Sequence, residues 1–140
     1  MIVHGVLMAQ ARGGRLRGVL ITGPSGSGKS DLALRLLDEG FLFAADDRVE
    51  LWTSGGRLYG RAPDALFGLM EIRGLGVRAQ TAITFAPVSL IAVMSPAAEV
   101  ERVPEPEQET LLGIATPRVH LARYEVSATA KLRQVLMTLG

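Results

Sequence analysis

Hydrophobic residues occur in short runs along this chain, and small polar or glycine-rich segments separate the runs. Two β-rich runs within residues 2–22 flank Gly13-Gly14, a pair that can supply the positive φ values of a tight turn. Residues 48–62 repeat the arrangement, with the sequence SGG at the turn. The pattern therefore predicts two β-hairpins.

Longer apolar segments follow the first hairpin. Residues 29–40 have leucines spaced for one broad helical face, and the segment ends on a glycine suited to a helix C-cap. Residues 41–45 and 87–95 are apolar enough for buried strands, and the segment 99–109, with five glutamates and two prolines, is typical of an exposed loop. We expect a last strand over 118–126.

Two further segments contain signals for a helix start. Ser127 is a candidate N-cap for a last helix over 127–139. Pro63 is a candidate helix start, although three glycines interrupt the segment that follows. Neither repeats nor a linker between domains can be seen, so residues 1–140 are expected to form a single domain.

Composition narrows the function classes. With 140 residues, 48% of them hydrophobic and 21% charged, the chain resembles an ordinary globular domain. A net charge of +1 gives no basic surface for nucleic acid, and the lack of cysteine excludes disulfides and thiolate metal sites. The sequence has no secretory leader pattern and no apolar run long enough for a membrane span, so we expect a cytoplasmic protein.

The strongest motif is GPSGSGKS at residues 23–30. It satisfies the Walker A (P-loop) pattern, with a strand-like run before it and a helical pattern after it. Glycines allow backbone N–H groups to surround phosphate oxygens at the helix N-terminus. We expect nucleotide contacts from all eight residues, Gly23, Pro24, Ser25, Gly26, Ser27, Gly28, Lys29 and Ser30, with Lys29 on the β- and γ-phosphates and Ser30 on Mg²⁺. The predicted fold class is α/β, a P-loop-containing mixed β-sheet with a central helix after the phosphate loop and β-hairpins at the margins.

Two acids, Asp46 and Asp47, follow the apolar run 41–45. In P-loop proteins an acid at such a strand end holds Mg²⁺ or activates a nucleophile. Adjacent residues of a strand point to opposite sides, so we expect only one of the two carboxylates to face the phosphates. The alternative is an Asp-Asp turn that only ends the strand.

Four stretches together resemble one family. HGV at 4–6, GVLITGPSGSGKS at 18–30, ADDRV at 45–49 and LMEIRGLGV at 69–77 are similar, in order and spacing, to the catalytic core of the bacterial HPr kinase/phosphorylases. The resemblance is good over about residues 3–103. It implies an ATP-dependent kinase that phosphorylates a serine of the small phosphocarrier protein HPr, and that can remove this phosphate by phosphorolysis.

The resemblance also implies roles for individual residues. Asp47 matches the general base that takes the proton from the target serine, and His4 matches a histidine near that acid. Ser30 and Glu71 match the Mg²⁺ ligands. Arg102 falls where a catalytic arginine is expected, in a less similar segment. The family is typically hexameric, which implies a homo-oligomer, whereas His120 has no motif around it and is expected to be structural.

The chain departs from the family pattern downstream. A proline- and glycine-containing segment linked to dephosphorylation has no clear counterpart in residues 117–136. We also expect the protein to lack the additional N-terminal domain and the longer C-terminal helical part that many members have. Short forms of this kind occur in α-proteobacteria. We therefore expect a kinase whose phosphorylase activity is weak or absent.

Two other functions remain open at this stage. A small-molecule kinase of the shikimate or gluconate type also has a strand followed by a P-loop, but the segment MEIRGLG argues against it. A non-catalytic ATP-sensing module is the other alternative, against which the matching base and metal ligands count. A GTPase would need an N-K-x-D motif to read guanine, and the sequence has none.

Overall fold

The computed structural model describes residues 1–139, and its sheet is built outwards from an N-terminal hairpin. Strands β2 (Val6–Arg12) and β3 (Arg15–Thr22) pair antiparallel along their whole length. Gly13 and Gly14 form the turn between them with φ values of 59° and 72°. The predicted first hairpin is therefore confirmed, because these two positions need the left-handed conformation that glycine adopts without strain.

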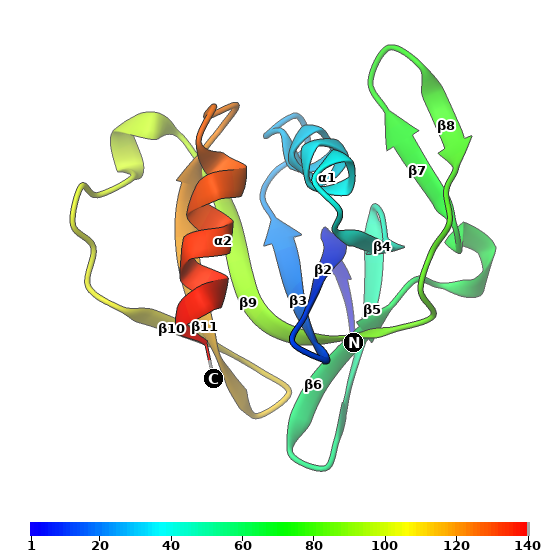
Figure 1. The fold of residues 1–140 in the computed structure, drawn as a ribbon, viewed down its shortest axis with the longest axis horizontal. Helices are drawn as coiled ribbons and strands as arrows, with labels where there is room; N and C mark the ends of the chain where they lie inside the picture. Colours follow the sequence, from blue (N-terminus) through cyan, green and yellow to red (C-terminus); the bar gives the residue numbers. More distant parts are fainter. Residues whose placement is uncertain (140) are drawn as a thin grey trace.

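Strands are the most frequent elements of the chain (Figure 1). The remaining elements, in chain order, are β1 (Ile2–His4), α1 (Lys29–Asp38), β4 (Leu42–Ala45), β5 (Arg48–Ser54), β6 (Arg57–Arg61), the 3-10 helix η1 (Asp64–Leu66), β7 (Leu69–Ile72), β8 (Gly76–Ala79), β9 (Ala86–Ser95), the 3-10 helix η2 (Ala97–Glu99), β10 (Glu107–Leu111), β11 (Ile114–Ala122) and α2 (Ala128–Thr138). The main sheet has the order β1-β5-β6-β9-β3-β2-β4, with β11 also on β9 and β10 on β11, while β7 and β8 pair only with each other.

Strand β9 joins the two parts of the main sheet. Its first residues pair antiparallel with β6, and its later residues pair parallel with β3 on one side and with β11 on the other. Gly18 of β3 lies where β9 changes from pairing with β6 to pairing with β3. A Cβ atom on Gly18 would lie 2.0 Å from the carbonyl oxygen of Pro87 in β9. Only glycine allows β3 and β9 to approach each other this closely.

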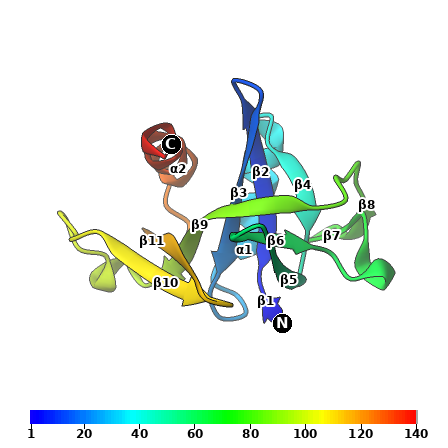
Figure 2. The same ribbon diagram turned by 90° about the horizontal axis from the view of Figure 1, so that it is seen from below.

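Both faces of the sheet are buried, since successive side chains of a strand point to opposite faces. Met8 and Val19 contribute to a core beneath the two helices, where Leu32 of α1 and Leu132 of α2 also pack. On the opposite face, a second core contains residues from the β5–β6 hairpin together with neighbouring strand residues (Leu7, Leu20, Leu51, Leu58, Ile91). Figure 2 shows α2 and the β5–β6 hairpin on opposite sides of β9.

Some predicted elements differ from those observed. The run over residues 2–10 is not one strand: it divides at Gly5 into β1, which pairs with β5, and β2. Pro63, the candidate helix start, is the N-cap of the short 3-10 helix η1 only, and the chain then forms the β7–β8 hairpin. Gly74 and Gly76, with φ values of 88° and 87°, supply the turn of this hairpin.

The C-terminal region also starts its strands earlier than expected. Residues 107–109, predicted as exposed loop, belong to β10 and pair with β11. Ser127 stands at the N-cap position of α2, but its hydroxyl donates to Glu125 Oε1 rather than to a backbone N–H of the helix. Across the described residues, no helix is both long and apolar enough to span a bilayer.

Candidate active site

The glycine-rich loop links the end of β3 to the start of α1. Gly23 has a φ of 146°, and a Cβ atom there would lie 2.7 Å from Ser27 Oγ. Gly28, with a φ of 91°, occupies the N-cap position of α1. Both glycines are therefore required by backbone conformation, and they direct the loop over the positive end of the helix dipole.

Lys29 folds back over this loop from the first residue of α1. Its Nζ donates hydrogen bonds to the carbonyl oxygens of Gly23 at 2.7 Å and Pro24 at 2.9 Å. Partial burial lowers the pKa of Lys29, and the nearby carboxylates of Asp46 and Asp47 oppose this shift. The ammonium group thus lies at the loop with negative charge close by.

A cavity of about 510 Å³ opens beside the loop. It lies between the loop, the end of β4, strand β7 and the connector from β11 to α2, and its lining consists of Val6, Ser25, Gly26, Gly28, Lys29, Ser30, Asp31, Leu34, Asp46, Asp47, Glu71, Ile72, Arg73 and Tyr124. The structure therefore brings together most of the predicted site residues. His4 and Arg102 are not among the described residues that line it.

The two acids after β4 have different environments. Asp46 is buried, with 6% of the residue exposed, and its Oδ2 accepts the backbone N–H of Glu71 at 2.8 Å. Burial raises the pKa of Asp46, hydrogen bonds from the N–H groups of Glu71 and Asp47 oppose the shift, and the nearby negative charges add to it. The side chain of Asp47 is 63% exposed.

Both Asp46 and Asp47 line the cavity. The expectation that only one would face the phosphates assumed extended backbone at both positions. Asp47 instead has a φ of 70°, in the left-handed region, so the alternation of the strand ends before it. Both adjacent residues can thereby contribute to the cavity lining.

Residues from β1 and β5 surround Asp47 on its outer side. His4 Nδ1 lies 3.8 Å from Asp47 Oδ1, and Arg48 Nε lies 3.8 Å from Oδ2. The backbone N–H of Gly5 donates to the carbonyl oxygen of Asp47 at 3.1 Å. The structure thus brings His4 to Asp47 at the rim of the site, as a neighbour of the acid.

Arg102 lies in the segment between η2 and β10 and is exposed. In Figure 1 this yellow segment runs beyond α2, whereas the β7–β8 hairpin stands on the other side of α1. Within the described part of the chain, Arg102 is therefore not brought together with Lys29, Asp47 and Glu71.

Comparison with protein-family models identifies the family. The model of the HPr Serine kinase C-terminal domain matches residues 1–122. The chain belongs to this family. The match includes the glycine-rich loop, the acid pair and the β7–β8 hairpin, and so covers most of the cavity lining.

Individual relatives agree with the family model. The HPr kinase/phosphorylase of Mycoplasma pneumoniae is 48% identical over 75 residues, which are 54% of this chain and 23% of that protein. That of Clostridium beijerinckii is 43% identical over 75 residues, covering 54% of this chain and 24% of that protein. The aligned part of the chain thus spans about a quarter of the length of these relatives.

A solved structure shows the same fold. The HPr(Ser) kinase/phosphatase of Coxiella burnetii matches with a TM-score of 0.80 and 22% identity, over 98% of both chains. The expected mixed α/β fold, here mostly sheet with two α-helices, is therefore confirmed.

The residues of the cavity fit a Mg²⁺ ion that is also coordinated by a bound substrate. Ser30 and Glu71 line the cavity with Asp46 and Asp47. No cluster of three or more histidine, aspartate or glutamate side chains arranged to hold a metal occurs in the described residues. Mg²⁺ in nucleotide sites is held by one or two carboxylates, water and phosphate oxygens. The oxygen donors of the cavity fit that kind of site rather than an all-protein cage.

Sequence reasoning gave no role to six residues of the lining: Val6, Asp31, Leu34, Ile72, Arg73 and Tyr124. Tyr124 is the most distant of these from the glycine-rich loop along the chain. It follows β11 with a φ of 58°, and its hydroxyl donates to the carbonyl oxygen of Gly26 at 3.2 Å. No motif surrounds it in the sequence, and its approach to the loop depends on tertiary structure across 98 residues of chain.

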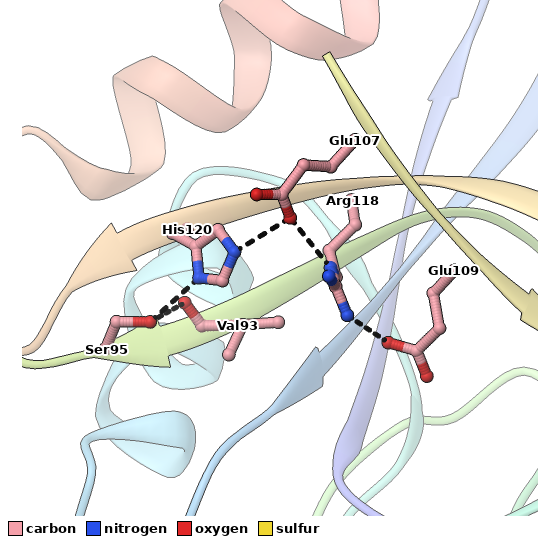
Figure 3. A network of polar contacts seen from close by, with 6 residues as sticks. All are labelled: Val93, Ser95, Glu107, Glu109, Arg118 and His120. Atoms are coloured by element: carbon pink, nitrogen blue, oxygen red, sulfur yellow. Dashed lines mark hydrogen bonds and ion pairs between the residues drawn. The ribbon is translucent and has the colours of Figure 1, made fainter. Parts of the chain in front are cut away.

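His120 belongs to a polar network outside the cavity lining (Figure 3). Its Nδ1 lies 3.0 Å from Ser95 Oγ of β9, and its Nε2 lies 3.0 Å from Glu107 Oε2 of β10. Arg118 donates to Glu107 and Glu109. Hydrogen bonds from His120 and then Arg118 hold the pKa of Glu107 below its usual value. The network joins three neighbouring strands.

Proposed function

We propose that this chain is an ATP-dependent protein serine kinase that phosphorylates an HPr-like phosphocarrier protein. One observation carries the proposal: a single cavity contains the glycine-rich loop with Lys29, the exposed carboxylate of Asp47 and the carboxylate of Glu71. Phosphoryl transfer needs a phosphate cradle, cations for the charge on the γ-phosphoryl oxygens and a base near the nucleophile. The family relationship supports the same activity.

The proposed chemistry begins with ATP on the loop of residues 23–30. Lys29 would exchange its hydrogen bonds with Gly23 and Pro24 for phosphate oxygens, and Mg²⁺, when bound through Ser30 and Glu71, would neutralise phosphate charge. Asp47 would accept the proton of the target serine hydroxyl. The serine oxygen then forms a bond to the γ-phosphorus, the bond to the β–γ bridging oxygen breaks, and ADP leaves.

Two further residues have supporting parts in this proposal. His4 lies 3.8 Å from Asp47, where its imidazole can interact with the carboxylate during proton transfer. Arg102 would have to reach the transferred phosphoryl group by movement of its segment or from a neighbouring copy of the chain. The second route agrees with the expected homo-oligomer, a hexamer by family resemblance.

We also propose the domain organisation, the partners and the cellular location of this kinase. Residues 1–140 act as a single P-loop kinase domain, with the HPr-like protein as substrate and without nucleic acid or membrane as partner. The site is expected to work in the cytoplasm, since ATP, Mg²⁺ and HPr meet there. Phosphorolysis of phosphoserine-HPr would use the same centre in reverse, with inorganic phosphate as the attacking group.

The test is incubation of the protein with γ-labelled ATP, Mg²⁺ and HPr from the same organism, followed by mass spectrometry of HPr. Label on one HPr serine, lost when that serine is replaced by alanine, is the expected result. ATP turnover without HPr but with small hydroxyl compounds would favour a small-molecule kinase. ATP binding with no transfer to any acceptor would indicate a sensing module.

A further inference from the structure

The cavity has an acidic end and an aromatic end, and the order of the strands determines where each end lies. Strands β4, β3, β9 and β11 run in the same direction, so their carboxyl ends lie along one edge of the sheet. Asp46 and Asp47 follow β4, the glycine-rich loop follows β3, and Tyr124 follows β11. The loop therefore lies between the acids and Tyr124. Ligands of α/β sheets commonly bind along this edge.

Tyr124 contacts the loop directly. Its hydroxyl donates to the Gly26 carbonyl oxygen at 3.2 Å, and one side of its ring would lie 3.3 to 3.6 Å from a Cβ atom built on Gly28. The residue is nevertheless 55% exposed and lines the cavity. Tyr124 thus contacts the loop and is exposed beside the cavity.

The backbone of Tyr124 is strained and is held in place by its neighbours. A φ of 58° is rare for a bulky side chain. The N–H of Arg123 donates to the Ser95 carbonyl oxygen at 3.1 Å, and Arg35 Nη1 of α1 donates to the Glu125 carbonyl oxygen at 3.0 Å. Strain that is fixed from both sides is common at ligand sites.

We propose that the ring of Tyr124 is the stacking surface for the nucleobase, so that the nucleotide binds with its base at the β11 end and its γ-phosphoryl group at Asp47. This inference rests on the proposed function. A triphosphate on the loop that presents its last phosphoryl group to the acids must direct its other end toward β11. The aromatic residue there offers a surface on which any base can stack.

The test compares a ligand that has a base with one that has none. Binding of ATP and of inorganic tripolyphosphate is measured by calorimetry for the wild type, Tyr124→Asn and Tyr124→Phe. Asparagine tolerates a positive φ, so Tyr124→Asn removes the ring without added backbone strain. Tyr124→Phe is the matched control, since it keeps the ring and loses only the hydroxyl.

Tyr124→Asn is expected to weaken ATP binding on the order of tenfold and to leave tripolyphosphate binding within about twofold of the wild type. Tyr124→Phe should stay within about twofold for both ligands. Equal loss of both ligands in Tyr124→Asn would overturn the proposal and leave Tyr124 as a support of the loop. Unchanged ATP binding in Tyr124→Asn would overturn it as well.

A fourth variant gives a readout independent of affinity. Tyr124→Trp keeps an aromatic surface, and its fluorescence, after subtraction of the Trp52 signal of the wild type, should respond to ATP but not to tripolyphosphate. An equal response to both ligands would contradict stacking. If the wild type binds neither ligand, the proposal of a phosphate-binding loop fails, and this inference fails with it.

Discussion

The backbone N–H of Glu71 donates a hydrogen bond of 2.8 Å to Oδ2 of Asp46. This bond connects β7 to the residue that follows β4, although among the described residues the β7–β8 hairpin has no strand pairing with the main sheet. The acceptor is a buried carboxylate whose pKa is raised by burial. The same interaction thus brings Glu71 to the cavity and holds the Asp46 carboxylate in a buried position, where its charge reduces the stability of the fold.

Substitutions at Asp46 separate the effect of its buried charge on stability from the effect of its hydrogen bond to the Glu71 N–H. Because the pKa of Asp46 in the folded state lies above its ordinary value of 3.8, the folded state binds the proton more tightly than the unfolded state does. The ionised group therefore lowers the free energy of unfolding at neutral pH, and this cost is relieved as the pH falls through the folded-state pKa. Asp46→Asn should be more stable than the wild type at about pH 7, with a smaller advantage at about pH 4.

Asp46→Ala is the matched variant, because it removes the acceptor together with the charge. It leaves the Glu71 N–H without its partner and should be about 1–3 kcal/mol less stable than Asp46→Asn in urea denaturation. Equal stability of the two variants would show that the hydrogen bond does not anchor the hairpin.

Glu107 is expected to show the opposite pH dependence. His120 and Arg118 lower the pKa of Glu107, so its contribution to stability is present above the ordinary glutamate pKa of 4.5 and is lost as the pH falls through the folded-state pKa. Glu107→Gln should melt below the wild type at neutral pH, and the difference should vanish in acid. Glu105→Gln, in the preceding exposed segment, is the control and should melt like the wild type. A difference for Glu107→Gln that persists in acid would contradict this.

Gly18→Ala tests the close approach of β3 and β9. The added Cβ atom would lie 2.0 Å from the Pro87 carbonyl oxygen, so one backbone must move. We expect a loss of about 1–3 kcal/mol or more in the free energy of unfolding. Arg17→Ala, one position earlier in the same strand, should change stability little. If both variants unfold at the same denaturant concentration, the strands can separate at this point without cost.

The elements that the sequence predicted well are those that depend on local signals. Gly13-Gly14 define a turn through their own conformational freedom, and the leucine spacing of residues 29–40 predicts α1 without reference to the rest of the chain. The glycine-rich loop is likewise predicted from its own residues alone. Each of these segments contains its own stop and start signals.

The features that the sequence did not predict depend on tertiary structure. Neither the left-handed backbone of Asp47, which brings both acids to the cavity, nor that of Tyr124 is signalled by the residues around it, since non-glycine residues rarely adopt this conformation. The β7–β8 hairpin was missed because its glycines could equally end a helix. Arg102 shows the reverse case, in which a resemblance predicted a site residue that the described structure leaves outside the cavity.

Lys29→Ala should abolish ATP-dependent transfer while the protein stays folded. The side chain contacts the loop carbonyl oxygens of Gly23 and Pro24 rather than the apolar core, so its loss removes a phosphate ligand at little cost in stability. Transfer is measured with labelled ATP, and folding by circular dichroism. Arg15→Ala, at the opposite end of β3, is a control for loss of a positive charge and should retain activity. Near-normal transfer by Lys29→Ala would refute the proposed role of the loop.

Asp47 is the proposed base because its carboxylate is exposed at the cavity, with His4 and Arg48 each 3.8 Å away. Asp46 has the raised pKa that would suit a base, but its Oδ2 is already bound to the Glu71 N–H and it is only 6% exposed. A serine hydroxyl can therefore reach Asp47 more easily than Asp46.

Asp47→Asn keeps the size of the side chain but cannot accept the serine proton. The kcat for transfer to HPr should fall by about 10²- to 10⁴-fold, whereas the affinity for ATP, measured by calorimetry, should change by about twofold at most. Asp46→Asn, which retains an acceptor for the Glu71 N–H, should lose much less of kcat. A severe loss in Asp46→Asn together with a mild one in Asp47→Asn would assign the base to the buried acid. In that case the left-handed turn at Asp47 would serve to shape the cavity rather than to present the base.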